Sequence, residues 1–254
     1  MRWAIFSDVH ANLPALEAVW KSLQRQSPDM IFCLGDLVNQ HVWNNEVVEF
    51  IRGHHIATVK GNHDQGIGEG KTDFPFSYSS PDVYKWGKQA ITYTLSQIRA
   101  EHQAYLRQLP MHMYFSFTDH VRSIHCMLAH GSATSIEQYL FENLPQEELI
   151  AALDAAHADV LIVGHTHRPY HKIFYQGNQV KHLINVGSAG RPKDGNWRPV
   201  YVVVDWNINS SSNNNNDYLS VQFYRVEYDL EKSIKAIQAS PLSLYFASCL
   251  MQGE

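Results

Sequence analysis

The sequence predicts a layered α/β domain in which helices cover the faces of a β-sheet. Short apolar runs rich in Val, Ile and Phe recur along the chain, each bounded by glycine or a polar cluster, as is typical of buried strands. Segments with the apolar spacing of helices alternate with several of these runs, which favours helices packed on a sheet. A chain of 254 residues with 44% hydrophobic residues can bury the sizeable core that such a domain needs.

The strands are predicted from the apolar runs, taken in chain order. Seven buried strands are expected at residues 2–8, 30–36, 56–62, 124–131, 160–165, 182–188 and 199–206. An eighth run, at 218–229, is predicted to be an edge strand.

The helices are predicted from apolar residues that repeat every three or four positions. They are expected at 13–26, 44–54, 145–158 and 230–240, and residues 82–108 are predicted to be helical with one or two breaks. In the first helix the repeating residues are Leu16, Val19, Trp20 and Leu23. Asn12 is its predicted N-cap, and Pro14 lies in its first turn, where proline is tolerated.

Residues 1–254 are predicted to form a single domain, because the chain shows neither an internal repeat nor a strong boundary. Residues 65–108 are expected to form a lid or helical insertion over the site described below. Its aromatic residues are candidates for stacking on a nucleobase or an aryl leaving group, or belong to a lid that packs locally: Phe74, Phe76, Tyr78 and Trp86. The polar, low-complexity run 207–217 predicts a mobile loop.

The net charge and the cysteines indicate which partners and which cellular compartment to expect. The net charge of −5 provides no electrostatic reason to expect nucleic acid or an anionic membrane as a partner. Cys33 and Cys126 lie inside apolar runs and are predicted to be buried thiols, which fits a reducing compartment. The chain lacks a signal-peptide pattern and any run of about 18 apolar residues. We therefore expect a cytoplasmic protein.

Side chains with oxygen or imidazole donors follow five of the predicted strands, and all but His63 are candidate metal ligands. In chain order they are Asp8 and His10, Asp36, Asn62 and His63, His130, and His165 and His167. Because the carboxyl ends of strands in an open α/β sheet face one crevice, these side chains are predicted to converge. Asp8 and His10 are two positions apart, so an extended backbone would direct both at one cluster, and His165 and His167 have the same spacing.

Mixed oxygen and imidazole donors without thiolate favour Mn²⁺, Fe, Zn²⁺, Ni²⁺ or Co²⁺ over an all-oxygen calcium site. Seven ligands exceed what one ion needs. Two ions that share a carboxylate, about 3.5–4 Å apart, account for the number.

The order of the motifs DVH, GDLVN, GNHD, AHGS and GHTH resembles that of the calcineurin-like metallophosphoesterase superfamily. The motifs span residues 8–167, and NVGSAGRPKDG (185–195) and the C-terminal segment are similar to the small prokaryotic phosphodiesterase-like branch. The resemblance implies a four-layer αββα sandwich, with two packed mixed sheets between helices. It also implies two divalent transition-metal ions, manganese being the first choice and Fe, Zn, Ni, Co or Mg the alternatives.

The resemblance further implies a role for each site residue. One ion would be held by Asp8, His10, Asp36 and His167, and the second by Asp36, Asn62, His130 and His165. Asp36 would bridge the ions, and His63 would face the substrate instead of binding metal. Hydroxide that bridges the ions would attack the phosphorus while His63 assists the leaving group, or His63 would only orient Asn62. Asn62 and Arg191 are the candidate substrate-binding residues, although a surface ion pair is an equal alternative for Arg191.

One motif departs from the family pattern. The protein-phosphatase and symmetric diadenosine-tetraphosphatase branches read GDxVDRG or GDxVxRG, whereas this chain reads GDLVNQ. Asn39 stands where the protein phosphatases have an Asp partner for the catalytic histidine, and Gln40 replaces an arginine that can clamp phosphate. The departure disfavours both branches and leaves the charge state of His63 open.

The function predicted from these features is dinuclear metal-dependent hydrolysis of a small phosphoester, with phosphodiesters preferred. The alternatives are a nucleotide or dinucleoside-polyphosphate hydrolase, a protein Ser/Thr phosphatase, and a non-catalytic metal-binding scaffold.

Overall fold

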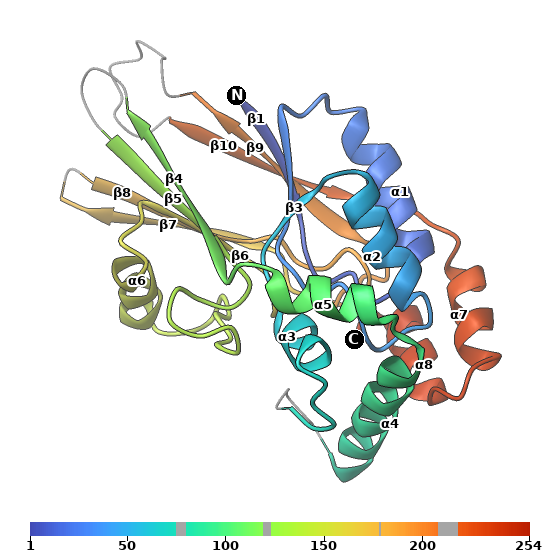
Figure 1. Cartoon of the computed structure of the whole chain (residues 1–254). Coiled ribbons are helices and arrows are strands. Elements are labelled where there is room, and N and C mark those ends of the chain that lie inside the picture. Colours follow the sequence, from blue (N-terminus) through green and yellow to red (C-terminus); the bar gives the residue numbers. More distant parts are fainter. Residues whose placement is uncertain (75–79, 119–122, 178, 208–217) are drawn as a thin grey trace.

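Two five-stranded sheets lie face to face in the computed structural model, which describes residues 1–74, 80–118, 123–177, 179–207 and 218–254 (Figure 1). The first sheet has the order β10-β9-β1-β2-β3. Its strands are β1 (Arg2–Phe6), β2 (Met30–Cys33), β3 (Ala57–Thr58), β9 (Val200–Trp206) and β10 (Leu219–Arg225). β1, β2 and β3 are parallel, whereas β9 and β10 run antiparallel to their neighbours, so the sheet is mixed.

The second sheet has the order β4-β5-β6-β8-β7. Its strands are β4 (His112–Thr118), β5 (Ser123–Ala129), β6 (Val160–Val163), β7 (Tyr170–Gln176) and β8 (Gln179–Asn185). The three inner strands are parallel, and antiparallel β4 and β7 form the edges. The carboxyl ends of the parallel strands in both sheets therefore provide the loops from which a site can be built.

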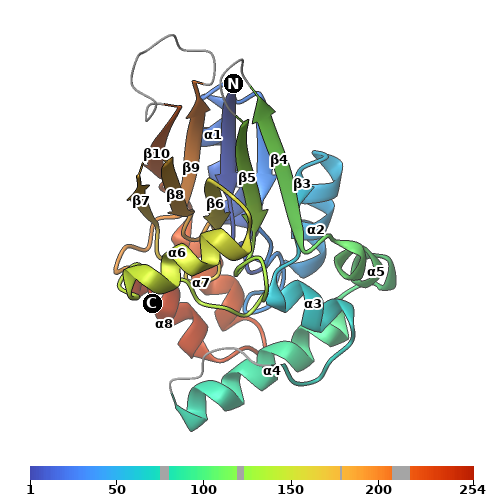
Figure 2. The same ribbon diagram turned by 90° about the vertical axis from the view of Figure 1, so that its left-hand side faces the viewer.

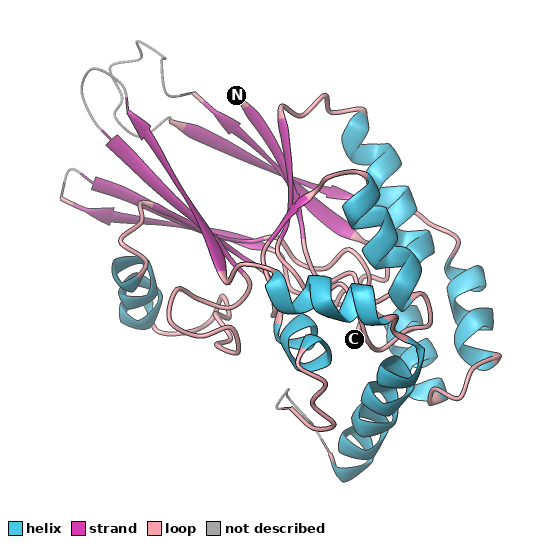
Figure 3. Cartoon of the chain, in the orientation of Figure 1, coloured by secondary structure: helices cyan, strands magenta, loops and turns pink. Residues whose placement is uncertain are grey.

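Helices cover the outer faces of the two sheets and one end of the strands (Figures 1 and 3). Beside the first sheet lie α1 (Leu13–Gln24), α2 (Asn44–Gly53) and α7 (Leu230–Gln238), and beside the second lies α6 (Gln146–Ala155). Four further helices gather towards the end of the strands (Figure 2): α3 (Asn62–Gly68), α4 (Pro81–Gln97), α5 (Ala100–Gln108) and α8 (Leu244–Gln252).

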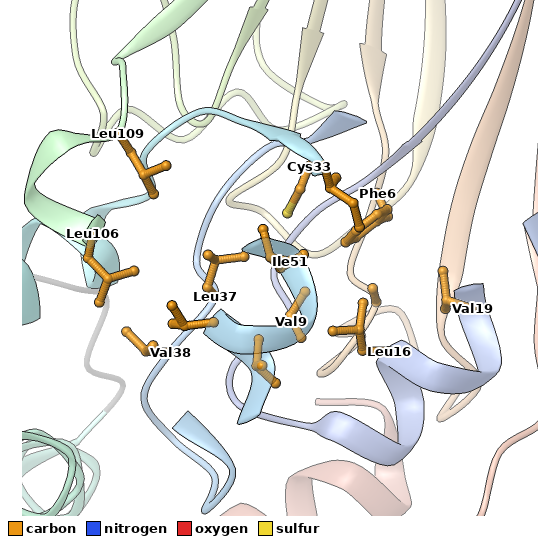
Figure 4. Packing of buried hydrophobic residues seen from close by; sticks show 14 of the residues in the cluster. Phe6, Val9, Leu16, Val19, Cys33, Leu37, Val38, Ile51, Leu106 and Leu109 are labelled. Carbon is orange, nitrogen blue, oxygen red and sulfur yellow. The ribbon is translucent and has the colours of Figure 1, made fainter. Parts of the chain in front are cut away.

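The alternation of side chains along the strands explains the four layers. In β1, Trp3 and Ile5 belong to the core between the sheets, whereas Ala4 and Phe6 pack beneath the helices. β6 alternates in the same way between the intersheet core and a cluster that includes α6. Figure 4 shows the helix-side cluster of the first sheet, where α1 and α2 bury their apolar faces against the strands. Strands that are buried on both faces confirm the predicted αββα sandwich.

The eight strands predicted from apolar runs are all present, and β10 is an edge strand as expected. β4 and β7 were not predicted. The residues of β4 alternate between more and less exposed positions, and β7 mixes buried with exposed residues, so both edge strands lack the continuous apolar run of the inner strands. The sequence also left α3 and α8 unpredicted, and β3 is only two residues long within the predicted 56–62.

The start of α1 differs from the prediction. Asn12 occupies the N-cap position, but its side chain makes no capping hydrogen bond. Instead its amide donates to the carbonyl of Gly190 at 2.8 Å and accepts from Ser233 Oγ at 2.8 Å. Asn12 therefore ties α1 to distant loops instead of capping the helix.

Two further predictions concern the cysteines and the polar run. Cys33 and Cys126 are buried and unpaired, and so is Cys249. All but the first residue of the predicted mobile loop 207–217 lies outside the described residues, as do Phe76 and Tyr78 of the predicted lid. Within the described part of the chain, every helix is too short or too polar to cross a membrane.

Candidate metal centre and substrate cavity

The candidate ligands lie in the loops at the carboxyl ends of five strands, where the two sheets contact each other (Figures 1 and 2). β1 leads to Asp8 and His10, β2 to Asp36, β3 to Asn62 at the start of α3, β5 to His130, and β6 to His165 and His167. All of these side chains are buried. The structure thus brings together residues spread over 160 positions of the chain.

Two glycines allow the loops to approach the carboxylates closely. A Cβ atom on Gly61 would lie 2.1 Å from Asp36 Oδ1, and one on Gly164 would lie 2.7 Å from Asp8 Oδ2. Instead, backbone amides donate to the same carboxylates: His63 N to Asp36 Oδ1 at 2.8 Å and His165 N to Asp8 Oδ2 at 3.0 Å. Each carboxylate keeps its other oxygen directed towards the imidazoles.

The backbone of the ligand loops is left-handed, not extended. Positive φ values occur at Asp8 (56°), His10 (46°), Asp36 (52°), His165 (65°) and His167 (59°). The extended backbone expected for each i, i+2 pair was therefore wrong. Asp8 and His10 still belong to one cluster, but His165 and His167 belong to different ones. A left-handed non-glycine residue costs about 1 kcal/mol or more, so surrounding contacts must hold these conformations.

The first cluster contains Asp8, His10 and His167. Asp8 Oδ1 lies 3.2 Å from His167 Nε2 and 3.8 Å from His10 Nε2, and the two Nε2 atoms are 3.2 Å apart. His167 Nδ1 donates to the carbonyl of Arg191, which leaves its Nε2 lone pair facing the cluster. Within the described residues, Asp8 Oδ1 has no hydrogen-bond donor although it is fully buried. An orphaned carboxylate oxygen beside imidazole lone pairs fits a cation.

The second cluster contains Asp36, His130 and His165, with Asn62 beside them. Asp36 Oδ2 lies 3.4 Å from His130 Nε2 and 3.6 Å from His10 Nε2. His130 Nε2 also lies 3.2 Å from Asn62 Oδ1 and 3.1 Å from His165 Nδ1. One carboxylate oxygen thus stands between the imidazoles of the two clusters, which is where the predicted bridging ligand belongs.

The tautomers of His130 and His165 provide a test of metal fit. His130 Nδ1 donates to the carbonyl of Leu34 at 2.7 Å, and His165 Nε2 donates to the carbonyl of Glu137 at 3.2 Å. Their remaining ring nitrogens, 3.1 Å apart, consequently present lone pairs to each other when both rings are neutral. Two lone pairs repel unless a cation lies between them, so these residues fit a metal ion.

The ionisation of the cluster supports the same interpretation. Burial opposes the charge on Asp8 and Asp36, but the facing histidines outweigh it and hold both pKa values below the usual range. Burial likewise lowers the pKa of His130, but Asp36 and Asp8 together raise it to about 9. Without metal, a proton therefore occupies the position that a divalent ion would take, and metal binding would displace it.

His63 differs from the ligands because Asn39 determines its tautomer. Asn39 Oδ1 accepts from Gln40 N at 2.8 Å and from Thr94 Oγ1 at 3.2 Å, so its amide nitrogen faces His63 Nδ1 at 2.9 Å. His63 Nδ1 then accepts, which favours Nε2 as the site of the proton in the neutral ring, although a second amide nitrogen, Gln40 Nε2, lies 3.4 Å from it. Burial, only partly opposed by Asp36, lowers the pKa of His63 to about 4. Nε2 lies 3.9 Å from Asp36 Oδ2, and His10, Asp36 and His63 form a third group of donors that could hold a metal ion. A proton on Nε2 would keep His63 out of the ligand set.

Asp64, the last residue of the GNHD motif, holds the loop after β2 next to the loop after β3. Its carboxylate accepts from Leu37 N at 2.9 Å and from Gly61 N at 3.0 Å. Burial and the neighbouring Asp36 raise the pKa of Asp64 to about 7. Sequence reasoning gave Asp64 no role, although its place in the motif was a signal.

A cavity of about 470 Å³ opens beside the clusters. Its lining includes Asp36 and His63 from the centre, Val83 and Gly87 from α4, and Lys193. Helix α4 lies within the predicted lid segment, so this part of the segment borders the cavity. Of the aromatic residues expected to stack on substrate, Phe74 is buried against His63, with ring centroids 5.5 Å apart, and Trp86 stacks on Tyr245.

Arg191 also lines the cavity, but partners within the chain already hold its guanidinium. Nη1 donates to Gln40 Oε1 at 2.6 Å, Nη2 lies 3.0 Å from Cys249 Sγ, and Nε donates to the carbonyl of Glu254 at 3.2 Å. The ion pair considered for it is not seen among the described residues, and its substrate-binding role stays a prediction. Its contacts fasten the 190–195 loop to the region of α8.

Comparison with known proteins identifies the family. Residues 1–208 match the family model of the calcineurin-like phosphoesterase superfamily domain. The chain belongs to this superfamily. Membership makes it a phosphoesterase of a metal-dependent family, and the clusters around Asp8 and Asp36 supply the donors for metal.

Similar proteins match this superfamily member along nearly its whole length. A metallophosphoesterase from Sphaerobacter thermophilus is 27% identical, with a TM-score of 0.72 over 100% of this chain and 99% of the other. A hypothetical protein from Pyrococcus horikoshii OT3 shares the fold, with 20% identity and a TM-score of 0.80 over 100% and 98%. An uncharacterized protein from Methanocaldococcus jannaschii is 29% identical over 99% of this chain and 98% of its own.

Proposed function

We propose that this phosphoesterase uses two divalent metal ions to hydrolyse small phosphate esters, with phosphodiesters preferred over monoesters. The single observation that supports two ions is the position of Asp36 Oδ2, 3.6 Å from His10 in one cluster and 3.4 Å from His130 in the other. One carboxylate that faces donors on both sides suits a bridging ligand.

Asp8, His10, Asp36 and His167 would hold one ion, and Asp36, Asn62, His130 and His165 the other. Bound divalent ions would neutralise the charge of the phosphoryl oxygens and make a nucleophile available from water at neutral pH. The chain's own contribution is to orient the donors, because the ring N–H groups of His130, His165 and His167 are fixed by backbone carbonyls.

His63 would assist the leaving group as a neutral donor from Nε2. The contact of Asn39 with Nδ1 favours the proton on Nε2, so His63 would donate a hydrogen bond to the departing oxygen without first becoming charged. A neutral His63 is consistent with Asn39 standing where the protein phosphatases have an aspartate. The arrangement favours neither a protein-phosphatase mechanism nor the orienting role considered for His63.

A nucleotide or dinucleoside-polyphosphate hydrolase is the second candidate. The aromatic residues Tyr139 and Phe141, which line the cavity, are stacked with ring centroids 5.3 Å apart and an interplanar angle of 4°. Such a surface could stack on a nucleobase.

A substrate panel tests the proposal. Protein loaded with Mn²⁺, Mg²⁺, Zn²⁺, Ni²⁺ or Co²⁺ would be assayed with bis-p-nitrophenyl phosphate, p-nitrophenyl phosphate and nucleoside triphosphates. We expect the diester to be turned over fastest with Mn²⁺. Preference for the nucleotides would favour the second candidate, and tight metal binding without turnover of any phosphoester would indicate a non-catalytic scaffold.

A further inference from the structure

The lining of the cavity brings three cations close to the metal centre: Arg168, Arg191 and Lys193. The guanidinium of Arg191 is engaged by its own chain, as described above. Arg168 is exposed, and its Nε donates to the backbone carbonyl of Lys193 at 2.8 Å. Lys193 therefore differs from both, because its ammonium is not used to hold the loop together.

The ammonium of Lys193 has no protein partner among the described residues, since neither a hydrogen bond nor an ion pair within 4.0 Å involves it. Burial and the nearby Arg191 lower the pKa of Lys193 to about 7, against the attraction of Asp8 and Asp36. The charge of Lys193 in turn lowers the pKa of His63 and of His167. A partly buried cation without a direct partner is unfavourable unless a ligand supplies one.

The backbone around Lys193 is held in place on both sides. Lys193 N donates to the carbonyl of His167 at 3.2 Å, and the next residue, Asp194, forms an ion pair with Arg225. The loop thus aims a lysine at the cavity from a fixed position beside the first cluster. Such preorganisation lowers the cost of binding a ligand there.

The charge of the loaded centre determines which ligand fits. Two divalent ions would carry more positive charge than Asp8 and Asp36 can neutralise. Lys193 would then face a positive centre across a cavity of about 470 Å³, so the occupant that both can stabilise is an anion.

We propose that Lys193 binds the non-bridging oxygens of the substrate's phosphoryl group and is the substrate-binding cation of this site. The inference rests on the proposed function, and it assigns to Lys193 the charge that the GDLVNQ motif lacks where Gln40 replaces arginine. A phosphoryl group with more anionic oxygens gains more from this contact, so terminal phosphates and monoesters depend on Lys193 more strongly than diesters do.

Calorimetric titration of inorganic phosphate into Mn²⁺-loaded protein tests the assignment independently of turnover. We expect Lys193→Met to weaken phosphate binding about tenfold, as loss of a charge-assisted hydrogen bond does, with the bound metal unchanged. Lys193→Arg should retain most of the affinity. The matched control is Lys235→Met, which removes an exposed lysine paired with Glu231 on α7 and should bind like wild type.

The outcomes separate the two proposals. Failure of the metal-loaded wild type to bind phosphate would overturn the proposed function itself. Wild-type affinity in Lys193→Met, with phosphate still bound, would overturn the role of Lys193 and leave the function standing. Loss of metal from Lys193→Met would also overturn the substrate-binding role of Lys193, because the lysine would then stabilise the metal centre and not the bound substrate.

Discussion

Histidine rings lie against one another in two regions of the described chain, and only one of these regions has the donors of a metal centre. In the loops beyond β1, β2, β5 and β6, imidazoles face the carboxylates of Asp8 and Asp36. On the second sheet, His182 of β8 lies next to His171 of β7, with His171 Nε2 and His182 Nδ1 3.0 Å apart. Here the described residues place no carboxylate in the cluster.

The same physical force acts differently in the two regions. Burial lowers the pKa of His182 to about 3, and the neighbouring His171 lowers it further. Burial also acts on His130, yet two carboxylates raise its pKa to about 9. A buried imidazole alone therefore indicates only a neutral packed ring. Convergence of imidazole lone pairs on a buried carboxylate oxygen is what indicates a cation site.

Removal of the shared carboxylate should produce the largest effect. Asp36→Asn should reduce turnover of bis-p-nitrophenyl phosphate on the order of a thousandfold, since the proposed bridge between the two ions is lost. Asp154→Asn, in an exposed carboxylate paired with Lys181, is the control and should be unaffected. The assay is steady-state hydrolysis together with elemental analysis of bound metal. Full activity in Asp36→Asn would refute the bridging role.

Matched histidine substitutions in the two regions test the contrast directly. His130→Ala should weaken metal binding about a hundredfold or more, because it removes a direct donor. His182→Ala removes an equally buried ring outside the centre and should retain both metals. Metal content after dialysis distinguishes them, and equal loss from both variants would show that His182 supports metal binding as much as His130 does.

Changes at His63 should separate chemistry from metal binding. His63→Ala should slow turnover by about 10²–10⁴-fold with the metal content unchanged, because a leaving-group donor is lost. Asn39→Leu, which removes the donor to His63 Nδ1, should slow turnover about tenfold, as loss of an orienting hydrogen bond does. If either variant lost its metal, His63 would belong to the ligand set after all.

The smallest effect concerns stability at acid pH. His182 has an ordinary pKa of 6.5 when unfolded and about 3 in the fold, so between these values the unfolded chain binds a proton that the native state does not. Stability is then lost as the pH falls from 6.5 towards 3, by up to about 1.4 kcal/mol per pH unit for one such group.

His182→Gln should reduce this slope relative to wild type in urea unfolding at a series of pH values without metal. The comparison must be made between variant and wild type, because burial also lowers the pKa of His41 to about 3. An unchanged slope would show that His182 takes up its proton in the folded state.

The inner strands and the positions of the ligands could be predicted from the sequence because both depend on local pattern. β1 and β6 are continuous apolar runs, and the residues that follow such strands reach the same end of the sheets. The left-handed backbone at Asp8 and His165 could not be predicted, because it is imposed by contacts between distant loops. The tautomer of His63 likewise depends on Asn39 and Thr94, which meet only in the folded chain. The ammonium of Lys193 has no partner among the described residues whereas the guanidinium of Arg191 has several, and no sequence pattern shows that.

The origin of the ligands has a mechanical consequence for the sandwich. Asp8, His10, Asp36 and Asn62 come from loops of the first sheet, whereas His130, His165 and His167 come from the second. Two metal ions bound among these residues would link the loops of the first sheet to those of the second. The two sheets would then be held together at this end of the sandwich. Metal binding should therefore raise the unfolding temperature of the protein. Removal of the metal by a chelator should let the two sheets separate first at the end where the ligands lie.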